Sequence, residues 1–191
     1  MSRFLESYNV ILASKSPRRR TLLQGLGIPF TVRTATCNET YPPELFKEDI
    51  AVYLAEKKAQ ALPPKNEKEL VITADTIVWH NQEVLAKPIN YSDAYQMLKR
   101  LSNNTHQVIT GVNVATQKKQ LSFYNETQVH FSKLTDEEIR YYIEKFRPYD
   151  KAGAYGIQEW IGFIGIKHIE GSYFNVVGLP VQQLYEVLKS F

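Results

Sequence analysis

Runs of apolar residues, and stretches where apolar and polar residues alternate, divide the chain into short strands. Residues 10–12 form an apolar run of the length of a buried strand, and 108–114 alternate as a half-buried strand does. A longer apolar run over 161–169 also favours a strand. The predicted strands cover 10–12, 30–34, 70–79, 83–86, 108–114, 121–131 and 161–169.

Helices are predicted where apolar residues recur every three or four positions beside a capping signal. Ser16 followed by Pro17 marks a helix start, because serine accepts a bond from an early backbone N–H and proline lacks that donor. Thr135 with Glu138 forms a capping box. The predicted helices start at Pro17 and end at Gly25 or Gly27, cover 45–61, extend from a cap at Ser92 to residue 101, and cover 135–146 and 180–188.

The mixture of hairpins and crossovers indicates a mixed α/β (α+β) fold. We expect a long mixed β-sheet flanked by helices, with two lobes around a cleft. The 191 residues suit a single domain over 1–191 that buries a sizeable core.

Composition narrows the function classes. A net charge of +3 is too small to indicate general nucleic-acid binding. The sole cysteine, Cys37, excludes an internal disulfide, and no apolar segment approaches the ~20 residues that span a bilayer. Glu6 and Asn9 stand where a signal peptide would be apolar, so we expect a cytoplasmic protein with no membrane partner.

The first helix carries cations where its own dipole disfavours them. Arg18, Arg19 and Arg20 occupy its first turn and Lys15 precedes it, and each cation there costs roughly 0.3–1 kcal/mol. A bound phosphate would offset this cost, because free N–H groups, the helix dipole and guanidinium groups all favour an anion. The alternative is a solvated basic face without a ligand.

A second group of charges lies on predicted regular elements. Asp75 falls in the middle of the 70–79 strand, where a carboxylate must be ion-paired, solvated at a strand break or used in chemistry. Lys58 follows Leu54 by four residues, on the apolar face predicted to bury Ile50, Leu54 and Ala61, so it either snorkels to solvent or faces a cleft. Lys87 ends the 83–86 strand.

These charges suit a polyphosphate with a divalent cation, since Mg²⁺ prefers one or two carboxylates plus substrate phosphates. The charged residues without an evident structural role are Arg18, Arg19, Lys58, Lys87, Lys151, Asp75 and Glu39. GxxxxGK[ST], GxGxxG and GxSxG motifs are absent, and the four histidines are scattered. The residues alone therefore indicate a cleft enzyme that acts on a phosphorylated small molecule.

Five motifs in order carry a resemblance to a known family. LASKSPRR, ADTIV, AKP, DKAGAYGIQ and GSYFNVVGLP resemble the Maf family of nucleoside triphosphate pyrophosphatases, over about residues 10–188. The resemblance implies an ITPase-like fold, a homodimer, and a house-cleaning activity that cleaves a nucleoside triphosphate to the monophosphate and pyrophosphate. It also implies a divalent cation such as Mg²⁺, Mn²⁺ or Co²⁺.

The resemblance also implies roles by position, with the ADT motif supplying the base that activates water. The matching residues are Asp75 as base, Arg18, Thr76 and Gln158 for substrate choice, Ser14, Arg19, Lys58 and Lys87 around the triphosphate, and Glu39 for the metal. The IQ of DKAGAYGIQ resembles the subgroup that acts on dTTP and UTP rather than 7-methyl-GTP.

Three positions depart from the family pattern. Asn38 stands where an acid is common, Lys15 replaces a smaller or neutral residue, and Glu159 follows Gln158 where glycine is usual. The alternatives are a nucleotide-binding regulator of cell division without essential catalysis, a 7-methyl-GTP-type pyrophosphatase, a phosphomonoesterase, and RNA binding through the arginines. The arginines lack an interleaved aromatic stacking platform, which disfavours RNA.

Overall fold

The computed structural model describes residues 5–191, which form a mixed α/β structure around one mixed sheet. The sheet order is β2-β1-β3-β5-β6-β7, with β4 paired to β3. The strands are β1 (Asn9–Leu12), β2 (Thr31–Val32), β3 (Glu69–His80), β4 (Glu83–Leu85), β5 (Thr105–Ala115), β6 (Gln120–Phe131) and β7 (Ile166–Glu170). The helices are α1 (Pro17–Gly25), α2 (Glu48–Ala61), α3 (Tyr91–Leu101), α4 (Asp136–Phe146), α5 (Trp160–Gly165), α6 (Tyr173–Val177) and α7 (Val181–Leu188).

The pairing directions explain why the sheet is mixed. β1 pairs in parallel with both β2 and β3, while β3–β4 and β6–β7 are antiparallel. The chain divides into two compact units, one of residues 5–75, 110–125 and 178–191, the other of 76–109 and 126–177. The divisions fall inside β3, β5 and β6, so these three strands contribute residues to both units.

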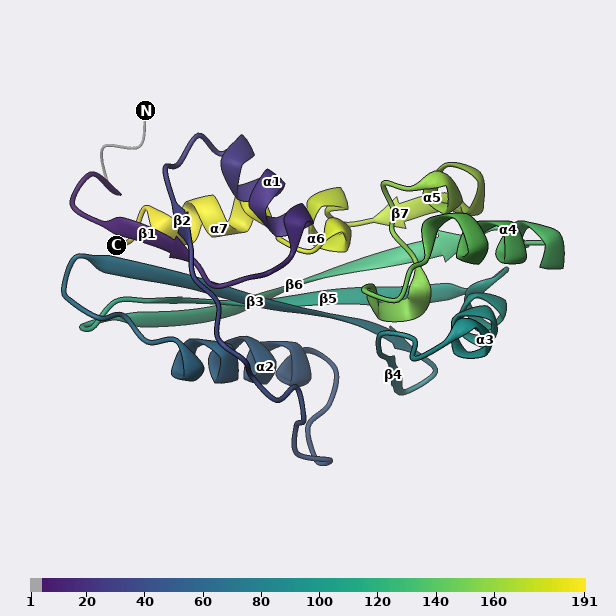
Figure 1. Cartoon of the computed structure of the whole chain (residues 1–191), viewed down its shortest axis with the longest axis horizontal. Helices are drawn as coiled ribbons and strands as arrows, with labels where there is room; N and C mark the ends of the chain where they lie inside the picture. Colours follow the sequence, from purple (N-terminus) through teal and green to yellow (C-terminus); the bar gives the residue numbers. More distant parts are fainter. Residues whose placement is uncertain (1–4) are drawn as a thin grey trace. The chain divides into compact units, whose positions relative to one another are not determined.

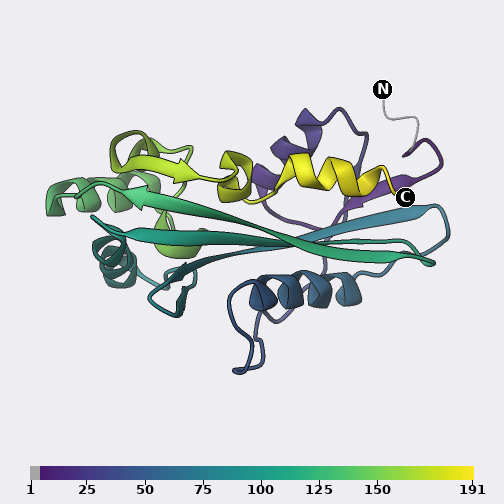
Figure 2. The same ribbon diagram turned by 180° about the vertical axis from the view of Figure 1, so that it is seen from behind.

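The first unit has helices on both faces of its strands. Figures 1 and 2 show α1 and α7 on one face and α2 on the other. Leu12, Leu23, Leu70 and Leu184 are fully buried in its main core. A Cβ on Gly111 of β5 would lie 2.3 Å from the Ala51 carbonyl carbon, so this glycine lets α2 pack directly on the strand backbone.

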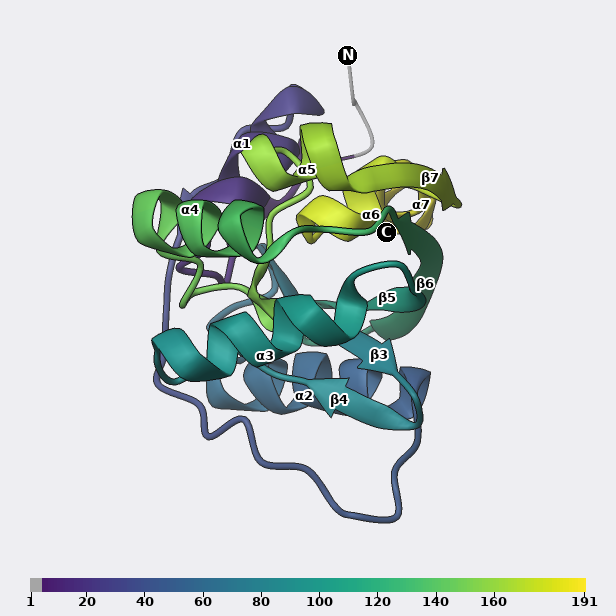
Figure 3. The same ribbon diagram turned by 90° about the vertical axis from the view of Figure 1, so that its right-hand side faces the viewer.

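The second unit has its own core beneath α3 and α4, which pack against each other (Figure 3). Leu98, Val129, Tyr142, Ile143 and Ile161 are fully buried there. The predicted capping box is confirmed, because Thr135 accepts from the Glu138 backbone N–H and the Glu138 carboxylate accepts from the Thr135 N–H.

The strand predicted over 161–169 is wrong in its first part. Residues 160–165 form α5, and only 166–170 are a strand. A Cβ on Gly162 would lie 1.8 Å from the Ile157 carbonyl oxygen, so the preceding loop packs against this turn of helix. The apolar run did not distinguish the two conformations, because short apolar runs suit a strand or a helix equally.

Several predicted helix details also need correction. The cap of α3 is Asn90, which accepts from the Asp93 N–H, instead of Ser92. α2 begins at residue 48 rather than 45, and its end residue Ala61 is exposed while Ala59 is buried. The strand predicted over 30–34 pairs only at Thr31–Val32. Within residues 5–191, no helix has the length and apolar character needed to cross a membrane.

Because His106 is buried, we expect the folded protein to lose stability in acid. Burial, and then the charges of His80 and His130, lower the pKa of His106 from its ordinary value of 6.5 to about 3, and its Nε2 lies 2.7 Å from the Tyr155 hydroxyl. Between these values the unfolded chain binds a proton that the folded chain does not. The stabilisation is therefore complete above pH 6.5 and declines by up to about 1.4 kcal/mol per pH unit toward pH 3.

Urea unfolding of the wild type and of His106→Gln between pH 4 and 7 measures this contribution. We expect a shallower acid slope in His106→Gln, and an unchanged slope in the exposed control His168→Gln. Equal slopes in all three proteins would contradict the assignment to His106.

Candidate active site

Two serine hydroxyls accept hydrogen bonds from the backbone in the loop after β1 and at the start of α1. Ser16 caps α1, and its Oγ accepts from the Arg19 backbone N–H at 3.4 Å, which confirms the predicted cap with Pro17 in the first turn. The buried Ser14 Oγ accepts from the Ser16 N–H at 3.2 Å. Lys15, between them, is exposed.

Arg19 ties α1 to two other segments of the first unit. Its Nε donates to the Gly178 carbonyl at 2.7 Å, and its Nη1 donates to the Ala74 carbonyl at 2.8 Å. Burial lowers the pKa of the Arg19 guanidinium, and the attraction of Asp75 opposes that shift. The guanidinium is therefore held beside the residue that precedes Asp75. Arg18, next to it in the first turn, is half-buried.

Lys58 of α2 joins two carboxylates. Its Nζ donates to Asp75 Oδ1 and lies 2.9 Å from Glu39 Oε1. Asp75 is only 8% exposed, so an ion pair is the state that its burial requires. The interpretation that Lys58 snorkels to solvent is therefore wrong, and of the three states considered for Asp75 the structure shows the paired one.

The loop that carries Glu39 is held to α2. Asn38 Oδ1 accepts from the Thr40 N–H at 3.1 Å, and Lys57 Nζ donates to the Thr40 carbonyl at 2.6 Å. The side-chain amide of Asn38 thus shapes the turn that carries Glu39. The family resemblance implied an acid at position 38. Neither Lys57 nor Thr40 has a periodic signal in the sequence that would predict this contact.

Glu39 and Asp75 are the carboxylates of this site that could bind a divalent cation. In the described part of the chain, no group of three or more His, Cys, Asp or Glu side chains could hold a metal. Glu39 and Asp75 nevertheless approach the same ammonium, so a single cation already lies between two carboxylates. Mg²⁺ in phosphoryl-transfer sites takes one or two carboxylates and completes its shell with water and substrate phosphates, so the residues fit such an ion.

The second unit holds the remaining residues that the resemblance singled out. Thr76 is half-buried in β3, and Lys87 is exposed beyond β4. Gln158 is half-buried in the glycine-rich loop of residues 149–158, and its Oε1 is buried without a hydrogen-bond partner among the described residues. The Gly153 N–H donates to the Ala86 carbonyl at 3.2 Å, which joins the loop to the segment carrying Lys87.

A polar network that no sequence pattern predicted holds the glycine-rich loop. Glu159 Oε1 lies 3.0 Å from Lys151 Nζ, and Glu159 Oε2 accepts from the Tyr142 hydroxyl. The Tyr142 oxygen accepts from the Gly156 N–H at 3.1 Å. The spacing of Tyr142 along its helix matches the apolar face and indicates only a core residue, so it gives no sign of this network.

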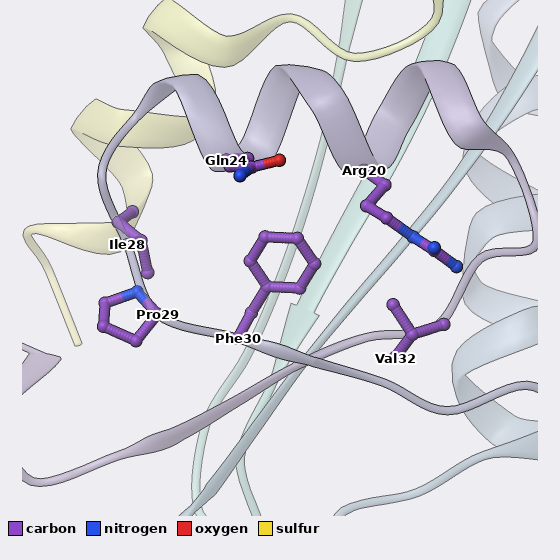
Figure 4. A pocket seen from close by; sticks show the side chains of 6 residues that line it. All are labelled: Arg20, Gln24, Ile28, Pro29, Phe30 and Val32. Carbon is purple, nitrogen blue, oxygen red and sulfur yellow. The ribbon is translucent and has the colours of Figure 1, made fainter.

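A separate hollow of about 480 Å³ lies beside α1 in the first unit (Figure 4). None of the residues proposed for the site lines it. Its lining is Arg20, Gln24, Ile28, Pro29, Phe30 and Val32.

Comparison with known proteins assigns a family. The model of the family described as "Maf-like protein" matches residues 9–191. The "dTTP/UTP pyrophosphatase" of Phocaeicola vulgatus is 57% identical over 187 residues, covering 97% of each chain, and that of Parabacteroides distasonis is 53% identical over 189 residues, covering 98% of each. Among solved structures, the Staphylococcus aureus Ham1 protein matches with a TM-score of 0.45 and 14% identity, covering 64% of this chain and 71% of its own. With a family model that matches nearly its whole length, this chain belongs to the Maf family.

Proposed function

We propose that the protein hydrolyses dTTP and UTP to the monophosphate and pyrophosphate. Relatives that are about half identical over nearly the full chain are named dTTP/UTP pyrophosphatases, which supports these two substrates. The structural observation that carries the proposed hydrolysis is the contact of the Lys58 ammonium with both Asp75 and Glu39. A carboxylate that could act as a general base and a second carboxylate that could bind a metal therefore contact the same ammonium.

The first unit would provide the chemistry. When bound, a divalent ion such as Mg²⁺, Mn²⁺ or Co²⁺ would neutralise phosphate charge, with Glu39 as its carboxylate ligand. Lys58 would shift from Asp75 to the phosphate oxygens and free the carboxylate. Asp75 would then accept a proton from the water that attacks the α-phosphorus, and pyrophosphate would leave. Arg19 and Ser14 would bind phosphate oxygens.

The second unit would provide base recognition through Gln158. An unpartnered amide oxygen accepts an N–H, and the amide NH₂ donates to a carbonyl. Uracil and thymine present an N3–H beside the O4 carbonyl, whereas cytosine presents an unprotonated N3 beside an amino group. An amide held in the orientation that pairs with uracil or thymine would leave its polar groups unpaired against cytosine. Such a site therefore rejects cytosine. Arg18, Thr76 and Lys87 take their roles in substrate choice and phosphate binding from the family resemblance.

Two further parts of the proposal concern the state of the protein. The family resemblance favours a homodimer, which stays a prediction. The cytoplasmic location expected from the sequence also stays a prediction.

The test is a panel of nucleoside triphosphates assayed with Mg²⁺, Mn²⁺ and Co²⁺. We expect pyrophosphate release from dTTP and UTP, with kcat/KM at least about tenfold above CTP and 7-methyl-GTP, because one unpaired polar group costs more than 1 kcal/mol. Orthophosphate as the product would indicate a phosphomonoesterase, and binding without turnover would indicate a regulator.

Replacing Asp75 by Asn should reduce kcat by roughly 10²–10⁴-fold, because the amide cannot accept the proton. Circular dichroism should show a folded protein. The matched control is Asp49→Asn, an exposed acid of α2 that should retain wild-type turnover. Near-normal turnover in Asp75→Asn would eliminate Asp75 as the base.

Replacing Glu39 by Gln should raise the Mg²⁺ concentration that gives half-maximal activity by about tenfold or more, because one carboxylate ligand is lost. Turnover at saturating Mg²⁺ should recover substantially. The control is Glu44→Gln, an exposed acid of the same region. An unchanged Mg²⁺ dependence would show that Glu39 does not bind the metal.

A further inference from the structure

Glu159 joins the two ends of the loop that carries Gln158. Its Oε1 lies 3.0 Å from Lys151 Nζ at the start of the loop. Its Oε2 accepts from the Tyr142 hydroxyl, whose oxygen in turn accepts from the Gly156 N–H at 3.1 Å. The Glu159 carboxylate thus links Lys151 to Tyr142 of α4, and Tyr142 in turn bonds the backbone of Gly156.

The network is too buried to be an incidental surface contact. The side chain of Lys151 is 9% exposed and that of Glu159 is 19% exposed, and Tyr142 is fully buried. Burial, followed by the bond to Glu159, raises the pKa of the Tyr142 hydroxyl far above its ordinary value, so this hydroxyl remains a donor. Removing one member of such a network leaves its partners unpaired away from water, which is costly.

Gly156 brings Glu159 and Gln158 to the same point of the loop. A Cβ on Gly156 would lie 2.9 Å from Glu159 Cδ and 3.2 Å from Gln158 Nε2, so both side chains contact the glycine backbone. The Gln158 Oε1 is buried without a partner in residues 5–191. The pose of the Gln158 amide therefore depends on the backbone that Glu159 holds.

We propose that Glu159 is a positioning residue for Gln158: by binding Lys151 and Tyr142 it fixes the loop, and thereby the direction in which the Gln158 amide faces a base. The inference rests on the proposed function of Gln158 as the group that reads uracil and thymine. Lys151 also pairs with Asp150 at 2.7 Å, but Asp150 is exposed, so Glu159 is the better-buried partner.

Steady-state kinetics of Glu159→Gln test this role. The neutral amide keeps the size of the side chain and removes the charge that holds Lys151. We expect the UTP-over-CTP ratio of kcat/KM to fall about tenfold, through a higher KM for UTP with kcat nearly unchanged, since one oriented hydrogen bond is lost. Tyr142→Phe should change the ratio in the same direction.

The matched control is Glu144→Gln, an exposed acid on the same helix as Tyr142, which should keep the wild-type ratio. A double-mutant cycle with Gln158→Ala separates positioning from general destabilisation. In the Gln158→Ala background, Glu159→Gln should change the ratio no further. A full additional loss in that background would overturn the proposal.

Amide hydrogen exchange of the nucleotide-free protein tests whether Glu159 holds the loop, and it needs no enzymatic activity. The Gly156 N–H, bonded to Tyr142, should exchange at least about tenfold faster in Glu159→Gln than in the wild type or Glu144→Gln. Unchanged exchange at Gly156 would overturn the role of Glu159. A wild type that hydrolyses no triphosphate would instead refute the proposed function, and the exchange result would still decide whether Glu159 holds the loop.

Discussion

The site of the first unit depends on one ammonium between two carboxylates. Asp75 lies in the buried strand β3, where a lone carboxylate is costly, and Lys58 of α2 supplies the charge that makes this burial tolerable. Glu39 completes the arrangement from a loop at 2.9 Å. The ammonium thus balances both carboxylates, and in the proposed mechanism a phosphate would compete with them for it.

The surrounding fold makes this contact possible. Gly111 has no side chain, so α2 packs on the backbone of β5 close enough for Lys58 to reach β3. On the other face, Arg19 bonds the carbonyls of Ala74 and Gly178, so α1 and the segment before α7 meet beside Asp75. These side chains are held before any ligand arrives, which lowers the ordering cost of binding.

The second unit holds Gln158, the residue proposed to recognise the base, within a different kind of network. There the glycine-rich segment is restrained by Tyr142, whose hydroxyl donates to Glu159 and accepts from the Gly156 N–H. If Gln158 reads the base, the glutamate that departs from the family pattern belongs to the selectivity of this particular chain rather than to its chemistry. Reaction type and base preference would then change independently in evolution, because they depend on separate networks.

The sequence by itself determined the features whose causes lie within a few residues. The Ser16 cap, the Thr135–Glu138 box and most strand positions are local effects of hydrogen bonding and periodicity, and the order of five short motifs was enough to recognise the family. Only the tertiary structure decided that Lys58 binds Asp75 and that Tyr142 binds Glu159. It also decided that residues 160–165 are helical. These outcomes depend on contacts between residues distant in sequence or on backbone packing around one glycine, and such contacts leave no periodic pattern along the chain.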